Sequence, residues 1–384
     1  MASTTLSAYP RGTGIPWYIW CAVLAITSAV VGANWDISWH MSIGRDTFWT
    51  SAHIAIYLCG VLAGLAFGYI ILWTTYSSSS ALAPASVHIW GFRAPLGAFI
   101  ASWGGIAMLT SAPFDNWWHD AYGLDVQIVS PPHIVLFLGI YGVLLGTMVL
   151  VAGHMNRSDG AVRQTSKILL LYGCGVMLTM VMTMLMEYME RMFLHTSQPY
   201  VILAVFVPIM LTVAARATDT RFAATFVAGF YTIFGIGLVL ILPLFPAEPK
   251  LGPVYQHVTH FIPEPFPVLL IVPALALDLL WMRTKHWNRW QAAAASAVVF
   301  VAFLLAAEWP FASFLMSPAS RNRLFGTAYF WYGLPPNTYE AHYLFRDRET
   351  LAHFWRGVVL AMVLGTLSFR FGISRGEWLH RIKR

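Results

Sequence analysis

The sequence has 384 residues, of which 58% are hydrophobic and only 10% are charged. A soluble domain has roughly a quarter of its residues charged. The composition therefore excludes a soluble enzyme and a disordered chain, and it is typical of a protein with several membrane spans. The three cysteines, Cys21, Cys59 and Cys174, all fall in apolar stretches and form no CxxC motif, which argues against a disulfide scaffold or a cysteine zinc site.

The apolar stretches predict an all-α fold, a polytopic transmembrane bundle of about ten spans, because a helix needs about 20 apolar residues to cross the bilayer. Continuous apolar runs, rather than alternating ones, favour helices. No basic region followed by a cleavage site precedes the first span, so we expect that span to be retained. The predicted spans are 15–34, 51–75, 94–113, 133–154, 166–186, 198–215, 222–244, 265–282, 290–310 and 351–371.

Charge separates the predicted loops into two sides. Most Lys and Arg residues fall on the side that holds both termini, whereas most Asp and Glu residues and most histidines lie on the other side. By the positive-inside rule, we expect a multi-pass protein of the inner (cytoplasmic) membrane with both termini in the cytoplasm. The acidic, histidine-rich side would then face outward.

The first two outer loops repeat one another. Residues 36–53 read DISWHMSIGRDTFWTSAH, and residues 115–133 read DNWWHDAYGLDVQIVSPPH. With one inserted residue before the final histidine, seven positions are identical, which is improbable by chance. The identical pairs are Asp36 and Asp115, Trp39 and Trp118, His40 and His119, Gly44 and Gly123, Asp46 and Asp125, Ser51 and Ser130, and His53 and His133. We infer a duplicated helical hairpin whose outer connection carries the motif.

The spacing of the repeat is typical of a metal site. Asp and His four residues apart share one helical face, and the second histidine is expected to open the next helix, as Pro131 and Pro132 indicate in the second copy. Each copy then offers two imidazoles and one carboxylate, a set that suits Cu, Zn or Fe and leaves coordination positions open. The predicted ligands are Asp36, His40, His53, Asp115, His119 and His133.

Other interpretations of these residues stay open. A single Asp or His in an outer loop is usually only solvated, so it is the repetition of the whole set that favours metal. Asp46 and Asp125 recur as well, and they would either accept the second ring N–H of a metal-bound histidine or cap helices. Haem ligation by the paired histidines is disfavoured, because Gly44 and the Pro131-Pro132 pair interrupt the continuous helix that it would need.

The rest of the chain adds weaker candidates. The end of the fifth predicted span is followed by Glu187, Glu190 and His195. A carboxylate there could bridge a dinuclear site or form a surface network with Arg191. We expect four regions: the duplicated hairpins, further spans, an outer aromatic cap loop, and a last span with a basic tail. Their limits are 1–155, 156–310, 311–350 and 351–384.

The two triads resemble the copper sites in the C subunit of the copper membrane monooxygenases, the particulate methane and ammonia monooxygenases. That family carries D-x3-H-x12-H in one membrane loop, which Asp36, His40 and His53 match, and the run 45–53 resembles its local sequence. Its neighbouring site has the pattern N-x3-H-x13-H. The spacing of the second copy agrees, with Asp115 where the family often has Asn. The resemblance covers roughly residues 20–155 and leaves 156–384 unplaced.

The resemblance implies a copper-dependent membrane monooxygenase, or its metal-binding C-type subunit. Such a protein would activate O2 to hydroxylate a small apolar or weakly polar substrate such as an alkane or ammonia. Copper is the expected cofactor, with iron as the runner-up because Asp115 makes the second site more anionic. Expected partners are the lipid bilayer, a quinol or other electron donor, and other oxygenase subunits or a second copy, but no nucleic acid. The alternatives are a di-iron membrane hydroxylase, a metal-stabilised structural subunit, and a copper- or zinc-handling membrane protein.

Overall fold

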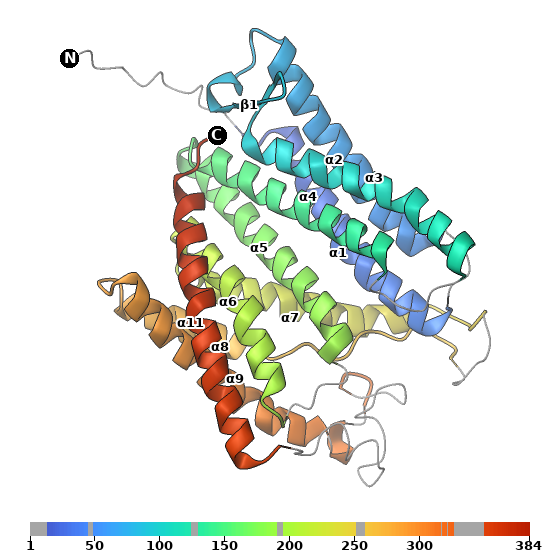
Figure 1. Cartoon of the computed structure of the whole chain (residues 1–384), viewed down its shortest axis with the longest axis vertical. Helices are drawn as coiled ribbons and strands as arrows, with labels where there is room; N and C mark the ends of the chain where they lie inside the picture. The colour runs from blue at the N-terminus through green and yellow to red at the C-terminus, as the bar shows by residue number, and fades with distance from the viewer. Residues whose placement is uncertain are drawn as a thin grey trace. The chain divides into compact units, whose positions relative to one another are not determined.

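The computed structural model describes residues 14–44, 49–123, 130–189, 195–250, 258–315, 317–320, 322–325 and 349–384. Long helices dominate these residues, which confirms the predicted all-α fold (Figure 1). The helices are α1 (Trp17–Ser42), α2 (Ser51–Tyr76), α3 (Leu96–Tyr122), α4 (Pro131–Met155), α5 (Gly160–Met189), α6 (Gln198–Thr218), α7 (Ala223–Ile241), α8 (Ile271–Arg283), α9 (Arg289–Leu315) and α11 (Leu351–Arg381). The short elements are η1 (Ala83–Ala85), η2 (Leu242–Leu244), η3 (Pro318–Ser320) and an antiparallel hairpin of β1 (Val87–Ile89) and β2 (Phe92–Ala94).

Nine of the described helices, all except α8, are long and apolar enough to cross a membrane. The chain is therefore a multi-pass membrane protein. The stretch predicted as a span at 265–282 is helical only from Ile271, and the 13 residues of α8 rise about 20 Å, short of the roughly 30 Å hydrocarbon layer. Prolines at 263, 265 and 267 explain the late start, because each lacks the N–H that a helix interior needs.

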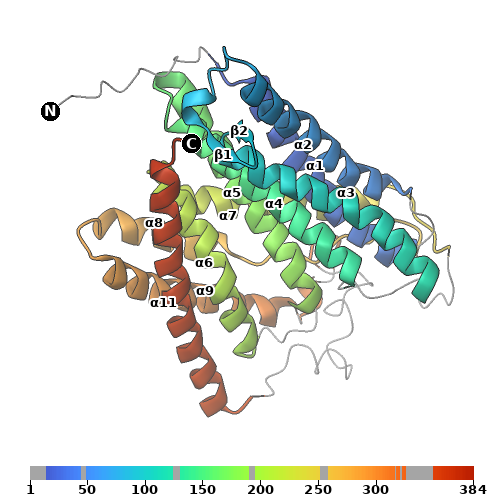
Figure 2. The same ribbon diagram turned by 45° about the horizontal axis from the view of Figure 1, so that its top comes forward.

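The described helices fall into two compact units. The first consists of residues 1–33, 48–173 and 378–384, and the second consists of residues 34–47 and 174–377. In the first unit, α3 packs along both α2 and α4 (Figure 2). In the second unit, α8 packs against α7 and α9, and α6 packs against both α7 and α9. Helices α1, α5 and α11 each contribute residues to both units.

Glycines set the close spacing of α3 and α4. A Cβ atom added at Gly104 would lie 2.5 Å from the backbone nitrogen of Val143, and one added at Gly146 would lie 2.5 Å from the backbone nitrogen of Ala101. Small residues let membrane helices approach this closely and pack along their backbones. Because α3 ends and α4 begins at the second copy of the repeat, this packing holds the two arms of that copy together.

We expect Gly146→Val to destabilise the first unit, because the valine side chain would overlap the backbone of α3. Overpacking of this kind costs about 1–3 kcal/mol. The matched control is Gly64→Val on α2, where an added Cβ meets no atom within 4 Å. Thermal unfolding of the detergent-solubilised protein checks the prediction, and equal melting temperatures for the two variants would contradict it.

Candidate metal centre

Both copies of the repeat end one helix and begin the next in the same way. Gly44 follows α1 with a φ of 87°, and Gly123 follows α3 with a φ of 86°, in the region that favours glycine. Thr50 caps α2 and Ser130 caps α4, and each side-chain oxygen accepts the backbone N–H of the histidine three residues later. The duplication seen in the sequence is therefore also a duplication of backbone geometry.

The caps revise how the two copies align. The sequence paired Ser51 with Ser130, but Thr50 occupies the capping position that Ser130 occupies in the second copy. Each cap lies three residues before the second histidine, so the inserted residue belongs ahead of the cap. Asp46 and Asp125, the predicted outer carboxylates, lie outside the described residues.

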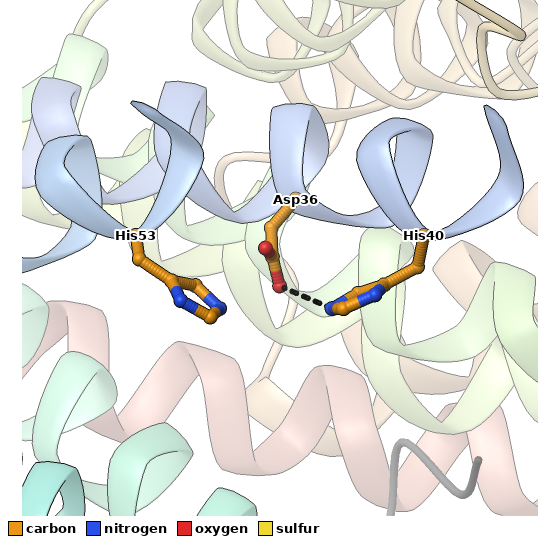
Figure 3. Close-up of side chains that lie close together, drawn as sticks. All are labelled: Asp36, His40 and His53. Atoms are coloured by element: carbon orange, nitrogen blue, oxygen red, sulfur yellow. Dashed lines mark ion pairs between the residues drawn. The ribbon is translucent and has the colours of Figure 1, made fainter. Parts of the chain in front are cut away.

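The first triad starts on a helix rather than in a loop. The sequence placed the end of the first span at residue 34, but α1 continues to Ser42, so Asp36 and His40 lie on its last turns. Asp36 Oδ2 is 3.5 Å from His40 Nε2, and both side chains are partly buried (Figure 3). His53 comes from the first turn of α2, as the spacing predicted, and one ligand atom of each of these three residues lies within 4.8 Å of the other two.

The end of α1 is held by a segment more than 200 residues away in the sequence. Ser38 Oγ donates to the carbonyl oxygen of Ile262 at 2.6 Å, and the backbone nitrogen of Ile262 donates to Ser42 Oγ at 2.7 Å. Trp39, one of the repeated tryptophans, packs on Phe261 with 5.7 Å between ring centroids. These contacts fix the last turns of α1, which carry Asp36 and His40. Nothing in the sequence of either segment indicates this pairing.

The second triad lies entirely within the first unit. Asp115 and His119 occupy the last turns of α3, and His133 occupies the first turn of α4. Asp115 Oδ1 is 3.4 Å from His119 Nε2 and 3.4 Å from His133 Nε2. This oxygen is buried and accepts no hydrogen bond from any residue that the structure describes. One carboxylate oxygen therefore faces two imidazole nitrogens.

A backbone carbonyl orients one of these imidazoles. His119 Nδ1 lies 3.3 Å from the carbonyl oxygen of Gly123. If Nδ1 carries the proton and donates it there, Nε2 keeps its lone pair toward Asp115, which is the tautomer that a metal ligand needs. The sequence offered Asp125, which lies outside the described residues, as a candidate for an orienting role, and it did not indicate this carbonyl. The signal that could have found it is the repeated glycine, because a glycine ending a helix turns its backbone back toward the last turn.

The Asp–His distances are close to those between ligands of one metal ion. Ligand atoms at about 2.0–2.1 Å from a metal lie about 2.9–3.4 Å from one another, for octahedral and tetrahedral angles respectively. Direct N–H···O hydrogen bonds are shorter, with a preferred length of about 2.9–3.0 Å. The Asp–His separations of 3.4 and 3.5 Å are longer than the preferred hydrogen bond and lie at or just beyond the upper end of the range for ligands of one metal ion.

Of the weaker candidate ligands, the structure describes the side chain of His195 but not those of the two glutamates. His195 is buried, and its Nε2 lies 3.2 Å from the carbonyl oxygen of Trp309 and 3.1 Å from Ser313 Oγ, both on α9. These partners account for a buried histidine without a metal. The side chains of Glu187 and Glu190 lie outside the described part of the chain. Residues 326–348 of the predicted cap loop also lie outside the described part of the chain. The first five residues of that predicted loop, 311–315, belong to α9.

The chain matches no protein-family model, no curated protein and no solved structure. The interpretation of the two triads therefore depends on their own chemistry. In the first triad, one ligand atom of each residue lies within 4.8 Å of the other two, and in the second, Asp115 Oδ1 lies 3.4 Å from each of two imidazoles. Each triad is built at a helix end followed by a capped helix start.

Proposed function

We propose that the protein is a copper-dependent membrane monooxygenase, or the metal-binding C-type subunit of one, in which the two Asp-His-His triads hold the metal. One observation carries the proposal: Asp115 Oδ1 is a buried carboxylate oxygen that faces two imidazole nitrogens at 3.4 Å. The same Asp–His pair recurs at Asp36 and His40. A duplicated cluster of three donors is hard to explain by solvation or by helix capping.

The residues have distinct parts in this proposal. The carboxylates of Asp36 and Asp115 supply one negative charge to each triad, and the imidazoles supply neutral nitrogen donors. The carbonyl of Gly123 orients the ring of His119. Three protein donors leave coordination positions open, and copper bound there would supply O2 activation for the hydroxylation of a small apolar or weakly polar substrate.

The membrane supplies the substrate route and the setting. Nine of the described helices are long and apolar enough to cross a bilayer, and in this proposal an alkane or ammonia reaches the site from the lipid. From the distribution of basic residues, we propose that both termini are cytoplasmic, that the membrane is the inner membrane and that the triads face its outer side. Electrons would come from a quinol or another donor, and other oxygenase subunits or a second copy would complete the enzyme.

Metal analysis tests this function. We expect full-length protein purified without added metal to contain stoichiometric copper by mass spectrometry, and to give a Cu(II) electron paramagnetic resonance signal with nitrogen hyperfine structure. Removal of the metal by a chelator should abolish the signal, and added copper should restore it. Stoichiometric iron without copper would favour the di-iron hydroxylase instead, and zinc alone would favour a structural or metal-handling role.

A further inference from the structure

Charge in the first unit is divided between the two ends of its helices. Among the residues of that unit that the structure describes, Asp115 and Asp120 lie near the end of α3, beside the second triad. The described Lys and Arg residues of the unit lie instead near the start of α3, the end of α4, the start of α5 and the end of α11, where Asp159 is the one described acid. These basic residues are Arg93, Arg157, Arg163, Lys167, Arg381, Lys383 and Arg384.

Hydrogen bonds hold two of these basic segments together. Asn156, which follows α4, donates from Nδ2 to the carbonyl oxygens of Leu379 and Ile382, at 2.8 Å in each case. Arg157 donates to the carbonyl oxygen of Lys383. The end of α11 and the turn between α4 and α5 therefore lie side by side, although more than 200 residues separate them in the sequence (Figure 1).

This arrangement gathers like charges. Residues 153–167 and 378–384 contain six Lys or Arg residues and one acidic residue. Whichever of these cations Asp159 pairs with, a large excess of positive charge remains, and such an excess destabilises a compact structure by self-repulsion. The bonds from Asn156 and Arg157 end on backbone carbonyls, so they hold the segments together without neutralising them. A bound anion would supply the opposite charge.

The surroundings favour the headgroup of a phospholipid over a soluble anion. Helices α4, α5 and α11 are all long and apolar enough to cross a membrane, so their ends lie at the membrane surface. Lys167 lies seven residues inside α5, about 10 Å along the helix axis, and its flexible side chain lets the ammonium group reach the headgroup layer. The next residue, Ile168, is 48% exposed and offers an apolar contact to an acyl chain.

We propose that these two segments form a binding site for the headgroup of an anionic phospholipid, with Arg163 and Lys167 contributed by α5 and Lys383 by the end of α11. Clusters of basic residues beside membrane helices recognise anionic lipids in this way. The described bond of Arg163 runs from Nη1 to the carbonyl oxygen of Met155 at 3.3 Å. Because a guanidinium group has five N–H donors, others can face a phosphate. The site does not depend on metal at either triad.

Lipid titration followed by native mass spectrometry, on the full-length protein in mild detergent, tests the proposal. We expect phosphatidylglycerol to bind at least about tenfold more tightly than phosphatidylcholine of the same acyl chains, since each basic residue near an anionic surface contributes about fivefold. Arg163→Gln combined with Lys167→Gln should weaken phosphatidylglycerol binding at least about tenfold. The matched control is Arg283→Gln combined with Lys285→Gln, which removes two exposed cations at the end of α8 in the second unit and should leave the affinity unchanged.

A variant that changes no charge tests the arrangement of the site. Asn156→Ala removes both bonds to Leu379 and Ile382, so the folded variant should also bind phosphatidylglycerol more weakly. The proposal is overturned if the two phospholipids bind equally, if the α5 pair of substitutions or folded Asn156→Ala protein retains full affinity, or if the control pair loses as much affinity as the α5 pair. It is also overturned if glycerol 3-phosphate alone binds as tightly as the lipid, because the site would then recognise a soluble anion.

Discussion

Replacing His119 by alanine is expected to lower the metal affinity of the second triad by at least about 100-fold, because loss of even an outer hydrogen-bonding partner of a metal ligand costs 10–100-fold. The substitution removes one of the two imidazoles that face Asp115 Oδ1. Chelator competition followed by metal quantification per chain measures the effect. The first triad should keep its metal, so roughly half of the total would remain.

His88→Ala is the matched control for that experiment. His88 lies exposed on β1 in the same unit and belongs to neither triad. Its replacement should leave the metal content and the competition curve unchanged. Asp115→Asn adds a test of charge, because it preserves the shape of the side chain but removes the negative charge from the site. Unchanged metal content in both His119→Ala and Asp115→Asn would refute the second triad as a metal site.

The double substitution of His40 and His119 by alanine should reduce O2-dependent substrate oxidation by at least about 100-fold, since each proposed metal site would lose a direct ligand. Each of these imidazoles lies beside the carboxylate of its own triad, at 3.5 and 3.4 Å. Product formation from an alkane or from ammonia, measured together with O2 uptake in native membranes, gives the effect. The two single variants identify which triad carries the chemistry.

The fold of the double variant decides between catalysis and structure. If the protein keeps its elution volume and its partners while activity disappears, the triads are catalytic. Loss of assembly together with activity would favour the metal-stabilised structural subunit. Full activity in a folded double variant would rule out both triads as the site of oxidation.

Local chemistry explains how far sequence reasoning reached. Long apolar runs bury every backbone polar group in a helix when they enter lipid, so composition alone predicted a membrane bundle. The repeat also predicted the Asp–His pairs, because Asp and His four residues apart share one face of a helix. Glycine at Gly44 and Gly123 and the proline pair before His133 mark a helix end and a helix start with little help from the rest of the chain.

Contacts between distant segments decided the rest. Helix α1 extends past its apolar run, so Asp36 and His40 lie on a helix. Hydrogen bonds of the Ser38 and Ser42 hydroxyls with the backbone of Ile262 stabilise that helix end. The short α8 and the carbonyl partner of His119 likewise appear only in three dimensions. The physical reason is that a hydrogen-bond partner is chosen by tertiary packing, which spacing along the chain does not encode.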